Sequence, residues 1–157
     1  MSSTTSKIAI VLVRGMIGMH PDVRKTLDLL RIKQKHVCVV IDDNAVSRGM
    51  VQRLKDYATY GTIDEASFKE ILDARGEVVG GQKAKDAKVD TAKLAKEFFE
   101  GKIKLNEFES KFKVKPFFRL HPPIGGFERK GIKMPYAKGG VLGDRKEAMA
   151  TLLRKML

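Results

Sequence analysis

Residues 8–13 read Ile8-Ala9-Ile10-Val11-Leu12-Val13. This apolar and largely β-branched run does not alternate with polar residues, so it predicts a strand that is central in a sheet or buried on both faces. A similar run at 37–41 (VCVVI) predicts a second buried strand. Residues 56–63 (DYATYGTI) are rich in β-forming types and predict a third strand. The segments between these strands decide how they are connected.

Those connecting segments have the apolar spacing of helices. Pro21 and Asp22 suit the first turn of one helix, and Asp43 is expected to cap a second. A third helix is expected at 64–75, with Gly76 as its C-terminal stop. The residues expected to face the interior are Val23, Leu27 and Leu30 in the first helix, Val46, Met50 and Leu54 in the second, and Phe68, Ile71 and Leu72 in the third.

The order β-α-β-α-β over residues 1–80 predicts an α/β fold, a small α+β sandwich of ferredoxin-like style with a three-stranded sheet. Residues 81–113 start with a linker rich in Lys and Asp and then show two helical segments, so they predict a helical insertion. Residues 114–157 predict a basic RNA-binding extension that ends in a helix capped by Asp144. Pro116 limits any strand in that extension to the edge of the sheet.

The charge of the chain points to a polyanionic partner. The chain has 157 residues, 43% of them hydrophobic, which suits one packed domain with extensions. Its net charge is +12, and residues 1–100 carry 17 basic and 14 acidic side chains, whereas residues 101–157 carry 14 and 5. This asymmetry predicts a globular core with a polyanion-binding extension. No apolar run reaches membrane-spanning length, so a membrane partner is not expected.

Catalytic and metal-binding functions are not indicated. Cys38 is the only cysteine, which excludes an intramolecular disulfide and a cysteine-based zinc site. Asp42 and Asp43 end a strand, but they lack a third carboxylate for a Mg²⁺ site. The loop with Gly15 and Gly18 lacks the residues that complete a nucleotide phosphate loop. We therefore expect no enzyme, no cofactor and no metal, and the absence of a signal-peptide pattern predicts an intracellular protein.

The strongest functional signal lies between Lys111 and Lys138, which bound a stretch of eight Lys or Arg residues and one acid, Glu128. Aromatic residues, prolines and glycines are interleaved with these cations. Because Pro and Gly interrupt regular structure, most of the stretch after Leu120 is expected to be an extended loop. Cations neutralise phosphates and rings stack on unpaired bases, so the stretch predicts contact with RNA or DNA. The alternative is a solvated basic loop whose Phe rings turn into the domain.

The residues expected to contact nucleic acid lie in three places. At the first strand–helix junction, a cation and two glycines precede a helix N-terminus with free N–H donors. In the second helix, two arginines face either solvent or phosphate. In the extension, glycine turns are expected to deliver cations and a ring to RNA, with the loop ordering only on binding. These residues are Arg14, Gly15 and Gly18 at the junction, Arg48 and Arg53 in the helix, and Arg119, His121, Gly125, Gly126, Phe127, Arg129, Lys130 and Lys133 in the extension.

Motifs spread over residues 7–80 and 114–157 point to a known family. In the first part they are 7–14 with the glycines of the following loop, 26–31 (TLDLLR), 36–40 (HVCVV) and 48–51 (RGMV), followed by Asp56, Tyr57 and Gly61. In the second part they are 118–123 (FRLHPP), 125–128 (GGFE), Gly139-Gly140 and Leu142-Gly143. Together these motifs resemble the large-subunit ribosomal protein family called L-thirty in bacteria and archaea, in its longer archaeal form. That family is similar in turn to the eukaryotic protein called L-seven.

The resemblance implies a structural constituent of the large ribosomal subunit that binds and stabilises ribosomal RNA and has no enzymatic activity. It implies 23S-type ribosomal RNA as the main partner, 5S RNA as a candidate neighbour, and contacts with other large-subunit proteins in cytoplasmic ribosomes. No small-molecule substrate is implied.

Three positions qualify the resemblance. The resemblance implies that Arg145 is a further RNA contact. However, the residue before it is Asp144, where the family commonly has an aromatic residue. Asn44 stands where the family usually has proline. The residues alone leave two other hypotheses open, a free-standing nucleic-acid-binding or chromatin protein and a nucleotide-using enzyme.

Overall fold

The computed structural model describes residues 6–157, so the first five residues of the expected core lie outside the described residues. One sheet contains β1 (Lys7–Leu12), β2 (Val37–Asp42), β3 (Ala58–Ile63), β4 (Phe118–Arg119) and β5 (Gly143–Asp144), in the order β4-β2-β1-β3-β5. β1 is antiparallel to both of its neighbours, β4 is antiparallel to β2, and β5 is parallel to β3. Because β2 and β3 flank β1 and run parallel to each other, the core is a split β-α-β arrangement.

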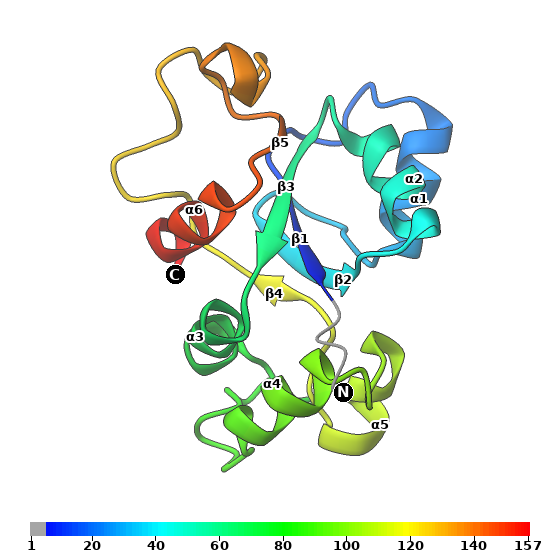
Figure 1. Cartoon of the computed structure of the whole chain (residues 1–157), viewed down its shortest axis with the longest axis vertical. Coiled ribbons are helices and arrows are strands. Elements are labelled where there is room, and N and C mark those ends of the chain that lie inside the picture. The colour runs from blue at the N-terminus through cyan, green and yellow to red at the C-terminus, as the bar shows by residue number, and fades with distance from the viewer. Residues whose placement is uncertain (1–5) are drawn as a thin grey trace.

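The helices cover both faces of this sheet (Figure 1). On one face lie α1 (Pro21–Leu29) and α2 (Ala45–Leu54), and on the other lie α3 (Glu65–Arg75), α4 (Thr91–Phe99), α5 (Phe108–Phe112) and α6 (Ala148–Met156). Two short 3₁₀ turns, η1 (Leu105–Glu107) and η2 (Tyr136–Lys138), complete the regular elements of residues 6–157. No helix in this described part combines the length and the apolar character that a membrane crossing needs.

The α/β class and the order of the first three strands and two helices are confirmed, but the predicted three-stranded sheet is wrong. The sheet has five strands because the extension folds back onto both of its edges. β4 forms on one edge, where Phe118 pairs with Cys38, and β5 forms on the other, where Gly143 pairs with Thr59. Each of these strands is two residues long, too short to show a period in the sequence.

The apolar runs of β1 and β2 do not alternate because each face of the sheet has its own core. Side chains point alternately to opposite faces along a strand. Ala9, Val11, Cys38 and Val40 therefore face α3, α4 and α6, whereas Ile8, Ile10, Val39 and Ile41 face α1 and α2. Each set is almost fully buried, which confirms the expectation of strands covered on both sides.

Segments from all parts of the chain meet in the core on the α3 face. Phe68 of α3 contacts the rings of Phe98 and Phe99 from α4, with centroid distances of 5.1 and 5.8 Å. The same ring contacts Phe108 of α5 and Phe118 of β4 at 6.4 and 5.9 Å. Such ring pairs stabilise a core beyond the burial of their area. The helices between 81 and 113 thus cover the second face of the sheet.

Three local predictions in the helices are wrong. Val46 was expected to face inward but is 75% exposed, and the face of α2 that packs on the core is formed by Met50, Val51 and Leu54. Asp43 does not cap α2; the cap position is Asn44, and the Asp43 carboxylate binds the Arg48 guanidinium. Asp144 does not cap α6 either, because it lies in β5 and accepts a hydrogen bond from the Lys146 N–H at 2.8 Å.

Gly61 is expected to be indispensable for the fit of α6 on β3. A Cβ at this position would overlap the backbone oxygen of Lys146 and lie 2.7 Å from Cβ of Met149. Because the backbone must move to accept a methyl group, Gly61→Ala should destabilise the protein by about 2 kcal/mol and lower Tm by roughly 4–8 °C. Gly49→Ala in α2 is the matched control, since its Cβ would meet no atom within 4 Å. The Tm of the control should equal or exceed that of the native chain, because alanine favours a helix more than glycine does. Equal Tm values for the two variants would contradict the prediction.

Candidate nucleic-acid interface

One end of the sheet collects most of the predicted cations. β1 ends there, while β2 and β3 begin there, because Val11 is paired with Cys38 and Leu12 with Ala58. The loops at this end are the β1–α1 junction with Arg14, the α1–β2 loop and the α2–β3 loop. The basic extension joins the same end, because Leu120 N–H donates to the backbone oxygen of His36 at 3.0 Å.

Arg14 leaves β1 in a fixed orientation. Its Nη1 donates to the backbone oxygen of Asp56 at 3.0 Å, and its guanidinium carbon lies 5.1 Å from the centroid of the Tyr57 ring. The loop that follows is exposed at Gly15 and Gly18, and Ile17 at its tip is fully exposed. The structure therefore brings the predicted cation and the predicted glycine loop together at the start of α1.

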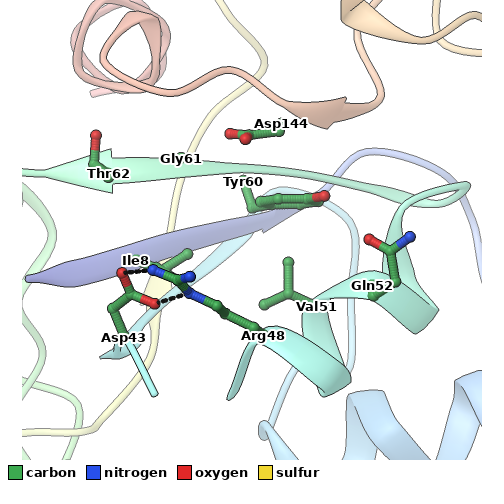
Figure 2. Close-up of a pocket in the computed structure, with 9 residues that line it drawn as sticks. All are labelled: Ile8, Asp43, Arg48, Val51, Gln52, Tyr60, Gly61, Thr62 and Asp144. Carbon is green, nitrogen blue, oxygen red and sulfur yellow. Dashed lines mark hydrogen bonds and ion pairs between the residues drawn. The ribbon is translucent and has the colours of Figure 1, made fainter. Parts of the chain in front are cut away.

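The two arginines of α2 lie in different places. The cap residue Asn44 follows β2, and the helix ends at Leu54, just before β3, so Arg53 in its last turn lies at the Arg14 end of the sheet. Arg48 lies near the opposite end, beside a cavity of about 370 Å³ (Figure 2). Its Nη2 is 2.8 Å from Oδ2 of Asp43, and this hydrogen bond lowers the pKa of the Asp43 carboxyl. Asp144 also lines the cavity, so the charge of Arg48 is compensated there.

The start of the extension lies at the edge of the sheet. The side chain of Arg119 in β4 is exposed, and its guanidinium carbon lies 5.8 Å from the centroid of the Phe117 ring. His121 is exposed too, and its backbone N–H donates to the Met156 oxygen at 3.0 Å. These contacts direct the chain along the end of α6 before the loop begins.

The base of the loop is packed against the domain. The Phe127 ring is half-buried against Val13, Val141 and Leu142. It also stacks on the ring of His36, with centroids 6.1 Å apart and an angle of 19° between the planes. The structure thus places Phe127 facing inward, beside the residue that precedes Arg14, where it fixes the loop to the cationic end of the sheet.

Arg145 is buried and its guanidinium is occupied by protein groups. Its Nη1 and Nη2 donate to the two carboxylate oxygens of Glu128, and its Nε donates to Thr59 Oγ1 at 2.8 Å. The ring of Tyr136 lies 4.7 Å from the guanidinium carbon. Only 4% of Arg145 is exposed, so we assign it to holding the loop rather than to reaching a phosphate. The hydrogen bonds from Arg145 lower the pKa of the Glu128 carboxyl.

The tip of the loop has its own backbone hydrogen bonds, from Lys130 N–H to the Gly139 oxygen at 3.4 Å and from Gly131 N–H to the Glu128 oxygen at 2.9 Å. Gly125 and Gly126 adopt φ values of +82° and +79°, which other residues rarely adopt, and the Gly126 N–H closes a turn on the Pro123 oxygen at 3.0 Å. Arg129, Lys130 and Lys133 follow with exposed side chains. Figure 1 shows this segment looping out beside α6 and returning to η2 and β5. The loop therefore presents three cations on a projecting segment with an anchored base.

Sequence reasoning missed the residues that support this interface. His36 was expected only to lead into a strand, yet it stacks on Phe127, and burial followed by the charge of Lys35 lowers its pKa. Glu128 is the single acid of a basic stretch, and this isolation was the only sign in the sequence that it pairs with a cation. The structure shows that its partner is Arg145. Among the described residues, no three His, Cys, Asp or Glu side chains gather as a metal site.

Comparisons with known proteins identify the family of this chain. Residues 8–58 match the family described as Ribosomal protein L30p/L7e. A relative from Methanopyrus kandleri, named Large ribosomal subunit protein uL30, is 38% identical over 152 residues, which cover 92% of this chain and 100% of the relative. Relatives of the same name from Staphylothermus marinus and Methanocella arvoryzae are 39% and 37% identical and cover 95% and 94% of this chain. The resemblance seen in the motifs is confirmed, and the chain belongs to the ribosomal protein L30p/L7e family.

Proposed function

We propose that this protein is a structural constituent of the large ribosomal subunit that binds and stabilises ribosomal RNA during translation. The observation that carries the proposal is the cationic end of the sheet, where Arg14, Arg53 and the anchored loop lie together. The relatives that match nearly the whole chain are named large ribosomal subunit proteins, which favours this function over a free-standing nucleic-acid-binding or chromatin protein.

Membership of the L30p/L7e family supports the proposed partners. We propose 23S-type ribosomal RNA as the main partner, with 5S RNA and other large-subunit proteins as neighbours, in cytoplasmic ribosomes. Within the chain, residues 1–80 position the junction at Arg14, residues 114–157 supply the loop, and residues 81–113 cover the second face of the sheet. Arg119, His121 and the loop tip are the proposed RNA contacts of the extension, and Arg48 is the weakest candidate because Asp43 compensates its charge.

Sedimentation of a cell lysate through a sucrose gradient at high salt tests the proposal. The protein should move with the large subunit and stay there when weakly bound proteins are stripped. Recovery in the free pool or with the nucleoid would support the chromatin hypothesis instead.

Arg14→Ala is expected to weaken binding to deproteinised large-subunit RNA and to reduce the salt dependence of that binding by about one counterion. The reason is that a guanidinium held by the Asp56 oxygen and the Tyr57 ring presents its charge at little entropic cost. The measurement is the slope of log K against log salt concentration. Lys96→Ala, an exposed cation of α4, is the control and should leave the slope unchanged. Equal slopes for the native chain and Arg14→Ala would place Arg14 outside the interface.

A further inference from the structure

A second cavity lies at the β4 edge of the sheet, apart from the loop and from the cavity in Figure 2. Its volume is about 510 Å³, within the range of roughly 300–1,000 Å³ that small-ligand sites occupy. The α1–β2 loop contributes Lys33 to its wall, and the chain around β4 contributes Phe117 and Arg119. The pairing of β4 with β2, in which Arg119 faces Val37, brings these distant residues together.

An aromatic ring and a guanidinium form one side of this cavity. Phe117 is half-buried because part of its ring packs on the core between the sheet and α1. The packed part holds the ring in place, and the guanidinium carbon of Arg119 lies over the ring, 5.8 Å from its centroid. A planar cation supported by a rigid ring is an arrangement on which an unpaired base stacks.

The charges around the cavity favour an anion. Lys33, Arg31 and Arg119 line it together with a single carboxylate, Asp28. Arg31 is partly used by an ion pair with Glu109, whose Oε1 is 3.0 Å from Arg31 Nη1, so Lys33 and Arg119 carry the available charge. The cavity beside Arg48 has the opposite balance, with two carboxylates and one guanidinium.

We propose that the cavity at the β4 edge binds one unpaired nucleotide of RNA, with its base stacked on Phe117 and Arg119 and its phosphate at Lys33. This inference rests on the proposed function, because it names a site on the same RNA-binding protein. It adds a contact of a different kind from the loop, which offers charge alone. The site would select a nucleotide that is flipped out of a helix, since a paired base has no free face to stack.

Three variants of the full chain test this site with deproteinised large-subunit RNA. Phe117→Leu keeps apolar packing but removes the ring face, so it should weaken binding about tenfold without changing the salt slope. Phe117→Trp should keep the affinity, and the fluorescence of the introduced indole should be quenched when RNA binds. Lys33→Ala should lower the salt slope by about one, whereas the exposed Lys69→Ala on the other face should not.

The outcomes separate this site from the proposed function. If Phe117→Leu binds as tightly as the native chain and the indole of Phe117→Trp is not quenched, the nucleotide site is overturned. The proposed function would still stand if removal of the loop cations weakened binding in the same assay. If the native chain shows no binding to ribosomal RNA, the proposed function and this site both fail. Thermal unfolding of each variant shows whether it is folded at the assay temperature, so that unfolding is excluded as the cause of a lost affinity.

Discussion

Replacing Arg129, Lys130 and Lys133 together with alanine should lower the affinity for large-subunit RNA about 100-fold at physiological salt. Each phosphate contact releases close to one counterion and contributes a few-fold in affinity at this ionic strength. The three side chains are exposed on a segment with an anchored base, so all three can reach phosphates together. The slope of log K against log salt concentration should fall by about 2 to 3.

The control for this variant removes the same charge elsewhere. Lys85, Lys93 and Lys96 are exposed on the segment that covers the second face of the sheet, and their replacement with alanine changes the net charge equally. This segment mixes acids with lysines, so we expect only a few-fold loss of affinity. Equal losses for the two triple variants would mean that net charge, rather than the loop, determines binding.

Arg145→Ala should release the base of the loop and destabilise the protein by about 2–3 kcal/mol, which lowers Tm by roughly 4–12 °C. The variant leaves the Glu128 carboxylate without its guanidinium partner. It also removes the hydrogen bond that Thr59 Oγ1 accepts, while the hydroxyl still donates to the Gly143 backbone oxygen at 3.3 Å. A fully buried charge left unpaired costs more, but the Glu128 side chain is 32% exposed and regains some hydration. Hydrogen exchange should show faster exchange at Tyr136 and Leu142, whose amides lie at the base of the loop.

Arg154→Ala is the matched control, because it removes a bidentate ion pair of the same kind from the surface. The Arg154 guanidinium binds Glu70, and both side chains are about half exposed, at 59% and 45%. Exposed pairs contribute little, so Tm should change by a degree or two at most. A similar loss in both variants would contradict the anchoring role of Arg145.

The pair at Arg145 also predicts a pH dependence. Its hydrogen bonds lower the pKa of Glu128 in the folded state. A carboxyl with a depressed folded pKa contributes stability that is present above its unfolded pKa and is lost as pH falls through the folded value. The native chain should therefore lose the protection of the Tyr136 and Leu142 amides in acid, whereas Arg145→Ala, already unprotected, should show little further change.

An anchored base changes how the loop is expected to bind RNA. The expectation that the whole loop orders only on binding stays a prediction for the tip at 129–133. At the base, the contacts of Phe127 with Val13 and His36 support order before binding. A loop that is held at its base loses less conformational entropy when its cations reach phosphates.

The sequence by itself determined the central part of the fold and the kind of partner. The runs at 8–13 and 37–41 form buried strands because their apolar character is a local property, and helical spacing between strands is local as well. The excess of cations after residue 100 is likewise read directly from composition, and it indicates a polyanion without further information. The motif resemblance then identified the family before any contact was known.

Only the tertiary structure decided which residues of the basic extension face the domain and which face the partner. Phe127 and Arg145 look like RNA contacts in the sequence, because the residue type does not show whether a ring or a guanidinium packs inward or projects outward. Phe127 turns inward because His36 and Val13 lie next to it, and Arg145 is buried because Glu128 and Thr59 meet it there. The two short edge strands form for the same reason. Such contacts join residues far apart in the chain, so they depend on how the whole chain packs and leave no period in the sequence.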